Sequence, residues 1–77
     1  MNKADMLIDV HPDLSEDDRE KLVDEIITLN GVLQAHFDPR HPHGHGLYVE
    51  YDPDAIHAKG VLEEVKRWDP QADMASL

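Results

Sequence analysis

Three histidines lie within five residues, at His41, His43 and His45, in a segment rich in proline and glycine. Neutral imidazoles suit zinc, nickel or divalent copper. In a straight strand these side chains would spread over about 13 Å, so they can share one ion only if the loop folds back on itself. Asp38, His36 or Asp52 could complete the shell. The spacing predicts a metal site at His36, His41, His43 and His45. The alternative interpretation is a plain polar turn.

The histidines also predict a response to pH. The chain holds six of them and carries a formal net charge of −10. Imidazole titrates near pH 6.5, so the net charge should change by several units between about pH 7.5 and 5.5. His11 and His57 lie at the ends of predicted elements and are interpreted as ordinary surface or capping residues.

Two predicted strands, 32–38 and 46–52, must position the histidine segment. Apolar residues alternate along both, which is the pattern of half-buried strands. Prolines and glycines between the strands predict a loop longer than a tight two-residue turn. The residues expected on the buried side are Leu33, Ala35 and Phe37 in the first strand and Leu47, Val49 and Tyr51 in the second.

A helix is predicted between these strands and the N-terminus. Ser15 is a good N-cap, and three acidic residues follow it in the first turn, where the helix dipole favours negative charge. Asn30-Gly31 should end the helix with a left-handed residue. The predicted buried stripe consists of Leu22, Ile26 and Leu29, with Val23 and Ile27 beside them.

The remaining segments complete a βαββαβ order. Residues 5–10 form a first strand, and a second helix runs through Val61 and Val65 to Trp68, which should act as a lid on the core. Ala72 and Met74 should alternate inward in a short last strand. Right-handed crossovers then predict an α+β ferredoxin-like sandwich over residues 1–77, a single domain with strand order 4-1-3-2 and both helices on one face. The histidine loop is expected at one end of the sheet and the start of the first helix at the other.

Composition limits the function classes. The chain has no cysteine, which excludes disulfides, thiolate metal sites and cysteine nucleophiles. Its acidity disfavours nucleic acid and anionic lipid and suits a basic protein partner. The sequence contains no nucleophile elbow, phosphate loop or zinc-protease motif, so we expect that it is not an enzyme. No apolar run suggests a membrane span or signal peptide, and a cytoplasmic location is expected.

The segments LNGV at Leu29–Val32 and LYVEYDPDAI at Leu47–Ile56 resemble the heavy-metal-associated domain. That family includes copper chaperones and the N-terminal modules of metal-pumping ATPases. The resemblance covers nearly the whole chain and implies the same βαββαβ fold. It also implies a Cys-x-x-Cys motif on the loop entering the first helix, but Ser15 and Asp18 occupy those positions. Monovalent copper is selected by sulfur ligands, so the copper site of the family is not expected here.

Two functional hypotheses remain. The first is a non-enzymatic interaction or regulatory module, related to heavy-metal-associated domains, whose acidic surface and free sheet edges bind a basic protein. Such a module would be a monomer or a weak dimer through a sheet edge. The second is a metal-binding or metal-delivery module that uses the loop at His41, His43 and His45 for zinc, nickel or divalent copper.

Overall fold

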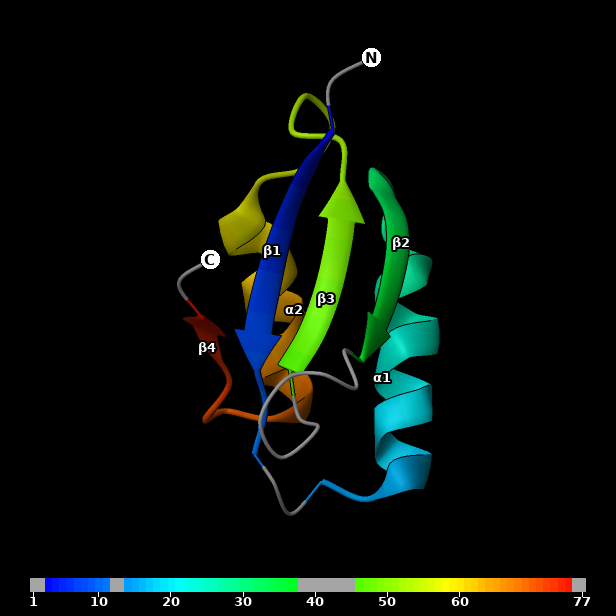
Figure 1. The fold of residues 1–77 in the computed structure, drawn as a ribbon, viewed down its shortest axis with the longest axis vertical. Helices are drawn as coiled ribbons and strands as arrows, with labels where there is room; N and C mark the ends of the chain where they lie inside the picture. Colours follow the sequence, from blue (N-terminus) through cyan, green and yellow to red (C-terminus); the bar gives the residue numbers. More distant parts are fainter. Residues whose placement is uncertain (1–2, 12–13, 38–45, 76–77) are drawn as a thin grey trace.

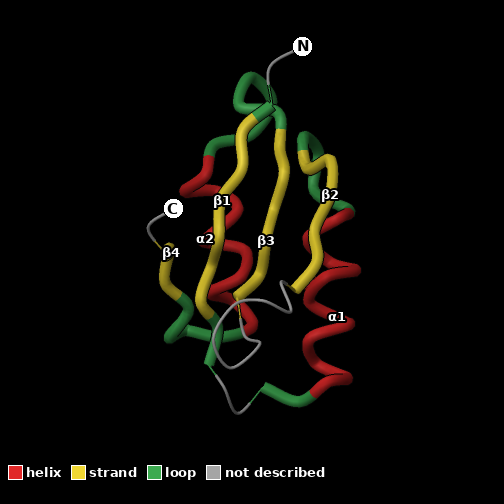
Figure 2. The backbone as a smooth tube through the Cα atoms, viewed as in Figure 1, coloured by secondary structure: helices red, strands yellow, loops and turns green. Residues whose placement is uncertain are grey.

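The computed structural model describes residues 3–11, 14–37 and 46–75. Its four strands form one antiparallel sheet in the order β2-β3-β1-β4, and the two helices cover one face of that sheet (Figures 1 and 2). The predicted ferredoxin-like sandwich and its strand order are confirmed. The elements are β1 (Ala4–Asp9), α1 (Glu16–Ile27), β2 (Val32–Phe37), β3 (Gly46–Tyr51), α2 (Ala58–Trp68) and β4 (Asp73–Ala75).

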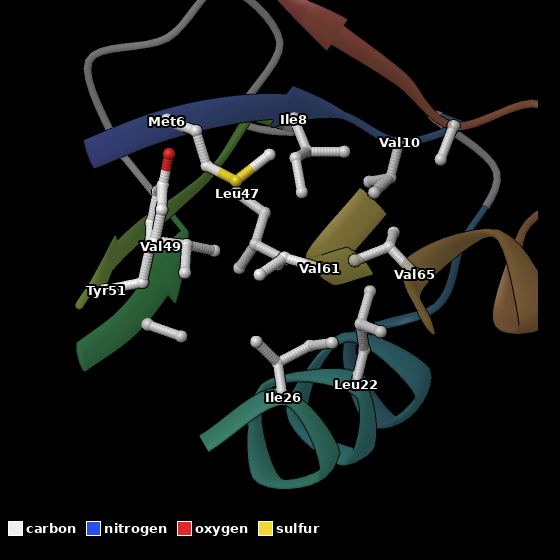
Figure 3. Close-up of a cluster of buried hydrophobic side chains, with 12 residues drawn as sticks. Met6, Ile8, Val10, Leu22, Ile26, Leu47, Val49, Tyr51, Val61 and Val65 are labelled. Atoms are coloured by element: carbon white, nitrogen blue, oxygen red, sulfur yellow. The ribbon is translucent and has the colours of Figure 1, made fainter. Parts of the chain in front are cut away.

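The helices and the sheet face that they cover share one apolar core (Figure 3). Its largest fully buried side chains come from both helices and from the two central strands. Phe37, Leu29 and Leu62 are partly buried and pack against this cluster. The predicted packing of the two amphipathic helices on the sheet is therefore confirmed. The fully buried side chains are Ile8, Leu22, Ile26, Leu47, Val49, Val61 and Val65.

Near the turn between α1 and β2, two side chains predicted to face the core are exposed. Leu33 is 45% exposed because the register of β2 shifts between Val32 and Gln34, which reverses the alternation of side chains at that point. Val32 packs against the core instead. Ile27, at the last position of α1, is 48% exposed. The strand alternation at Leu33 and the helical stripe at Ile27 therefore predicted burial wrongly. Both residues lie near the turn between α1 and β2.

That turn also begins earlier than predicted. α1 ends at Ile27 with Thr28 as its C-cap in right-handed helical conformation, before the predicted stop at Asn30-Gly31. Gly31 does adopt the predicted left-handed backbone, with φ of +100°. Its carbonyl accepts a hydrogen bond of 2.7 Å from the Asp52 backbone N–H. Gly31 therefore shapes the entry into β2 rather than the cap of the helix.

The C-terminal elements bury less than expected. Ala72 is buried, but Met74, predicted to face inward with it, is 41% exposed. Met74 pairs with Ile8, so it lies on the helix side of the sheet, where β4 is an edge strand of only three residues. Trp68 was predicted to be a lid on the core and is 39% exposed at the last position of α2.

The start of α1 lies at the same end of the sheet as Phe37 and Gly46, the described residues on either side of the histidine segment, so the prediction of opposite ends is wrong. β1 and β2 both pair antiparallel with β3, so they run in the same direction (Figure 1). Asp9, at the end of β1, pairs with Gly46, and Phe37 pairs with Leu47. α1 returns the chain along the length of the sheet, and β2 therefore ends where β1 ends. Among the described helices, none combines the length and apolar character needed to cross a bilayer.

Candidate functional site

The structure tests only one of the four predicted metal ligands. His41, His43 and His45 lie outside the described residues, so the predicted metal site stays a prediction. His36 is exposed in β2, and its ring centroid lies 5.1 Å from that of Tyr48 at an interplanar angle of 39°. Residues 3–11, 14–37 and 46–75 contain no group of three histidine, aspartate or glutamate side chains that could hold a metal.

The loop entering α1 carries a helix cap. Ser15 has extended backbone dihedrals, and its hydroxyl oxygen accepts a hydrogen bond of 3.1 Å from the Asp18 backbone N–H. Glu16, Asp17 and Asp18 occupy the first turn, where their negative charges interact favourably with the positive end of the helix dipole. The predicted capping role of Ser15 is confirmed. The two positions that would hold cysteines in the heavy-metal-associated family are thus joined by a structural hydrogen bond.

Replacing Ser15 by alanine should lower the free energy of unfolding by about 1 kcal/mol, because one backbone N–H of the first turn loses its partner. Urea unfolding measures this loss, and Ser15→Thr, which keeps the hydroxyl, should retain most of the stability. Zinc affinity should be the same in Ser15→Ala and the parent protein. A loss of zinc binding on this substitution would show instead that the loop ligates metal.

Asp69 is a buried carboxylate whose role sequence reasoning missed. Its Oδ2 accepts a hydrogen bond of 2.6 Å from the His11 backbone N–H, and its Oδ1 accepts one of 3.0 Å from the Gln71 backbone N–H. It therefore ties the end of β1 to the segment between α2 and β4. The bond to Gln71 forms an Asx turn, in which the aspartate side chain accepts from the backbone N–H two residues later. This local motif could have been recognised from the Asp69-Pro70 sequence. The contact with His11, 58 positions away, could not.

His57 was interpreted as a surface or capping residue. It occupies the N-cap position of α2 and is exposed, and its side chain makes no capping hydrogen bond. The surface interpretation is confirmed and the capping interpretation is wrong.

The sheet face opposite the helices, here called the uncovered face, has a row of apolar and aromatic side chains across its centre. Strand register places these side chains side by side, because residues that pair across neighbouring strands project from the same face. The row crosses all four strands from one edge of the sheet to the other. It consists of His36 in β2, Tyr48 in β3, Leu7 in β1 and Ala75 in β4.

Pairs of carboxylates flank this central row on both sides. Asp5 in β1 pairs directly with Glu50 in β3, and Asp9 in β1 pairs directly with Asp73 in β4. Like charges at directly opposed positions destabilise a sheet. Lys3 offsets part of this charge through an ion pair of 3.2 Å with Glu50. The register thus concentrates negative charge at two places on the uncovered face.

Tyr48 lies between the carboxylates of the first pair. Its hydroxyl oxygen is 3.3 Å from Asp5 Oδ2 and 3.3 Å from Glu50 Oε2. A phenol has one proton, so it can donate fully to only one of these oxygens at a time. Partial burial raises the pKa of Tyr48 above its ordinary value, and the charges of Asp5 and Glu50 raise it further. Tyr48 is therefore held protonated, with its one proton shared between the two carboxylates.

Tyr48 should ionise at a pH above the ordinary tyrosine value of about 10. Because its folded-state pKa exceeds its unfolded-state pKa, the linked stability is present below pH 10 and is lost as the pH rises further. Phenolate absorbance measures the titration, with Tyr48→Phe identifying the signal. Asp5→Asn and Glu50→Gln should each move the pKa of Tyr48 down toward the ordinary value. No movement in either variant would contradict the arrangement.

Comparison with known proteins identifies the fold. No family model and no curated protein sequence matches the chain. The chain is similar to solved structures over nearly their full lengths, and three of these are described as copper proteins. A copper binding domain from HMA7, a P-type ATPase, has a TM-score of 0.76 at 15% sequence identity over 94% of this chain and 93% of that domain.

A copper-ion-binding protein from Bacillus anthracis has a TM-score of 0.75 at 14% identity, over 96% of this chain and 97% of its own. A copper form of CopA from Bacillus subtilis has a TM-score of 0.69 at 12% identity, over 96% of this chain and 91% of its own. The resemblance to heavy-metal-associated domains is thus confirmed at the level of structure. This cysteine-free chain has the ferredoxin-like fold of copper-binding domains.

Proposed function

We propose that this chain is a non-enzymatic interaction module that binds a basic protein partner. The observation that supports the proposal is the opposition of like charges on the uncovered face, where Asp5 pairs directly with Glu50. Opposite charges at such a pair stabilise a sheet, whereas like charges destabilise it. A basic partner would relieve the repulsion, and the formal net charge of −10 would speed its approach.

The test is a titration with lysine-rich and glutamate-rich peptides of equal length, at low and at high salt. We expect saturable binding of the basic peptides that weakens steeply with salt, since exposed charges are screened over about 8 Å at physiological ionic strength. The acidic peptides should not bind. Failure of every basic peptide to bind at low salt would refute the proposal.

A metal-binding or metal-delivery role is the second candidate. It is supported by the position of Phe37 and Gly46, which bring both ends of segment 38–45 to the end of the molecule where α1 begins. The loop entering the first helix carries the cysteines of the heavy-metal-associated family. In this candidate role, histidines would take the place of those sulfur ligands, and His36, His41, His43 and His45 would hold zinc, nickel or divalent copper.

Zinc titration watched by NMR tests this second candidate. Saturable shifts of imidazole and backbone signals confined to residues 36–46, abolished by His43→Ala or His45→Ala, would support it. His57→Ala is the matched control, since this exposed histidine begins α2 at the opposite end of the sheet (Figure 1). Binding should be weak and should be lost below about pH 6 as the imidazoles protonate. Diffuse shifts over the acidic surface, unchanged in these variants, would favour the interaction module.

A further inference from the structure

We infer that β2 binds an extended segment of a partner protein, which adds to the sheet as a fifth strand and carries apolar and basic side chains at alternate positions. The inference rests on the proposed basic partner and assigns it to β2, which pairs with the strand that holds Glu50. β2 is the outermost strand on its side, and within residues 3–11, 14–37 and 46–75 no strand pairs with its outer edge. An outermost strand leaves every second backbone N–H and C=O unpaired within its sheet.

The two edges of the sheet differ in how well they resist pairing with another chain. β4, at the opposite edge, has three residues and includes Asp73, so shortness and charge protect it. β2 has six residues, and none of them is proline, lysine, arginine, aspartate or glutamate. Its register shift lies between Val32 and Gln34, and its pairing with β3 is regular from Gln34 to Phe37. β2 is therefore the edge that can accept another strand.

α1 supplies a floor for the added strand. This helix lies beside β2 and partly beyond it at the edge of the sheet (Figures 1 and 2). Ile27 follows Val23 by one helical turn and is 48% exposed, so it extends the apolar flank of α1. Neighbouring strands lie about 4.8 Å apart, so a fifth strand would run over this flank. A hollow of about 290 Å³ between α1 and β2, here called the α1–β2 groove, is lined by Arg19, Glu20, Val23, Asp24, His36 and Phe37.

Spacing along α1 decides which side chains the segment carries. Every second side chain of a strand points to the same face, so residues j, j+2 and j+4 would point to the helix side and span about 13 Å. Ile27, Val23 and Glu20 span about 10 Å along α1. The first two positions would therefore be apolar, because contact with Ile27 and Val23 removes apolar surface from water. The third would be basic, beside Glu20.

Charge complementarity favours the basic residue and disfavours a second copy of this chain as the occupant. Glu20 and Asp24 are exposed at positions i and i+4 of α1, where like charges destabilise a helix. The Arg19 guanidinium lies 5.5 Å from the Phe37 ring centroid. Two carboxylates against this one guanidinium leave the groove lining with one excess negative charge when His36 is neutral. A second copy would bring a formal net charge of −10 to this edge.

The experiment titrates the full chain with three short peptides. The first has valines at two alternate positions and lysine at the next alternate position, with threonines between them. The second has the same composition but adjacent valines, which point to opposite faces of a strand. The third has glutamate in place of lysine. We expect the first to bind about tenfold more tightly than either of the others, with NMR shifts along α1 and β2. Equal affinities in either comparison would overturn the inference.

Backbone pairing has its own test, in forms of the first peptide whose amide nitrogens are methylated at alternate residues. Methylation removes the N–H donors from one edge of a strand, and moving the methyl groups by one residue removes them from the other edge. We expect one form to lose about tenfold in affinity and the other to stay within about twofold of the parent peptide. Equal effects of the two methylation patterns would overturn the fifth strand.

Ile27→Ala tests the α1–β2 groove without disturbing the core, since Ile27 is exposed. It should weaken binding of the first peptide about fivefold, because part of the apolar contact is removed. Met74→Ala is the matched control, since Met74 is 41% exposed at the opposite edge of the sheet. Its affinity should stay within about twofold of the parent protein. Circular dichroism checks that both variants fold, and equal losses of affinity would overturn the assignment of the edge.

The outcomes separate this inference from the proposed function. Binding of lysine peptides that ignores the alternation, the methylation pattern and Ile27 would overturn the fifth strand and leave a basic partner in place. Sedimentation of the chain alone tests the second copy as occupant, and a dimer that Ile27→Ala dissociates would overturn the inference in favour of self-association. Failure of every basic peptide to bind at low salt would refute the proposed function itself.

Discussion

Replacing Ile26 by alanine is expected to lower the free energy of unfolding by about 2–5 kcal/mol. Ile26 is fully buried near the C-terminal end of α1, on the face that this helix turns toward the sheet (Figure 3). The truncation removes apolar contacts and leaves a cavity that a close-packed core refills only in part. Small domains have total stabilities of about 5–15 kcal/mol, so the variant should unfold at a much lower urea concentration.

The neighbouring residue supplies a matched control for this prediction. Ile27 is 48% exposed, and Ile27→Ala makes the same chemical change one position along the same helix. Its effect should stay within about 0.5 kcal/mol, since exposed positions contribute little to the core and alanine is a better helix former. Urea unfolding of both variants gives the comparison. Similar losses at the two positions would mean that α1 packs through a different face.

Replacing Gly31 by alanine is expected to cost about 2–4 kcal/mol, from backbone strain and from crowding. The φ of +100° at Gly31 is one that residues with a Cβ rarely adopt. A Cβ built at this position would lie 2.9 Å from the Ala55 Cβ and 2.9 Å from the Ile56 Cγ2. The turn into β2 and the connection between β3 and α2 would therefore have to move apart.

Gly60 tests whether this cost is specific to the backbone of Gly31. Gly60 lies in the first turn of α2, and a Cβ there would meet the Ile56 Cγ1 at an ordinary contact distance of 3.6 Å. Gly60→Ala should therefore raise the free energy of unfolding by about 0.5–1 kcal/mol, because alanine has the higher helix propensity. The two substitutions should thus move the urea midpoint in opposite directions. A loss of stability in both would contradict the description of α2.

His36 belongs both to the proposed interaction surface and to the predicted metal site. Its ring lies beside Tyr48 on the uncovered face, whereas its strand leads through Phe37 into residues 38–45. His36→Ala should therefore be included in both the peptide titration and the zinc titration. A change in peptide affinity with unchanged zinc affinity would assign this residue to the interaction surface.

Local patterns were enough to predict most of the fold. Ser15 and the stripe through Leu22 and Ile26 predicted α1, because capping and a 3.6-residue period depend on near neighbours. The alternation at Met6 and Ile8 predicted β1 in the same way. The order of elements then led to the strand order, since right-handed crossovers leave few arrangements of βαββαβ.

Tertiary structure decided what those patterns leave open. Leu33 turns outward because of a register shift that no period of two can show, and Asp69 binds the His11 N–H across a long stretch of chain. The rows of the uncovered face exist only because β1 pairs with β3 in one register, which sets Asp5 against Glu50. A slip of one residue would separate that pair, because side chains alternate between the two faces of a sheet. The sequence by itself therefore determined which elements form and which of their faces is apolar, and the pairing of distant strands determined which charges meet.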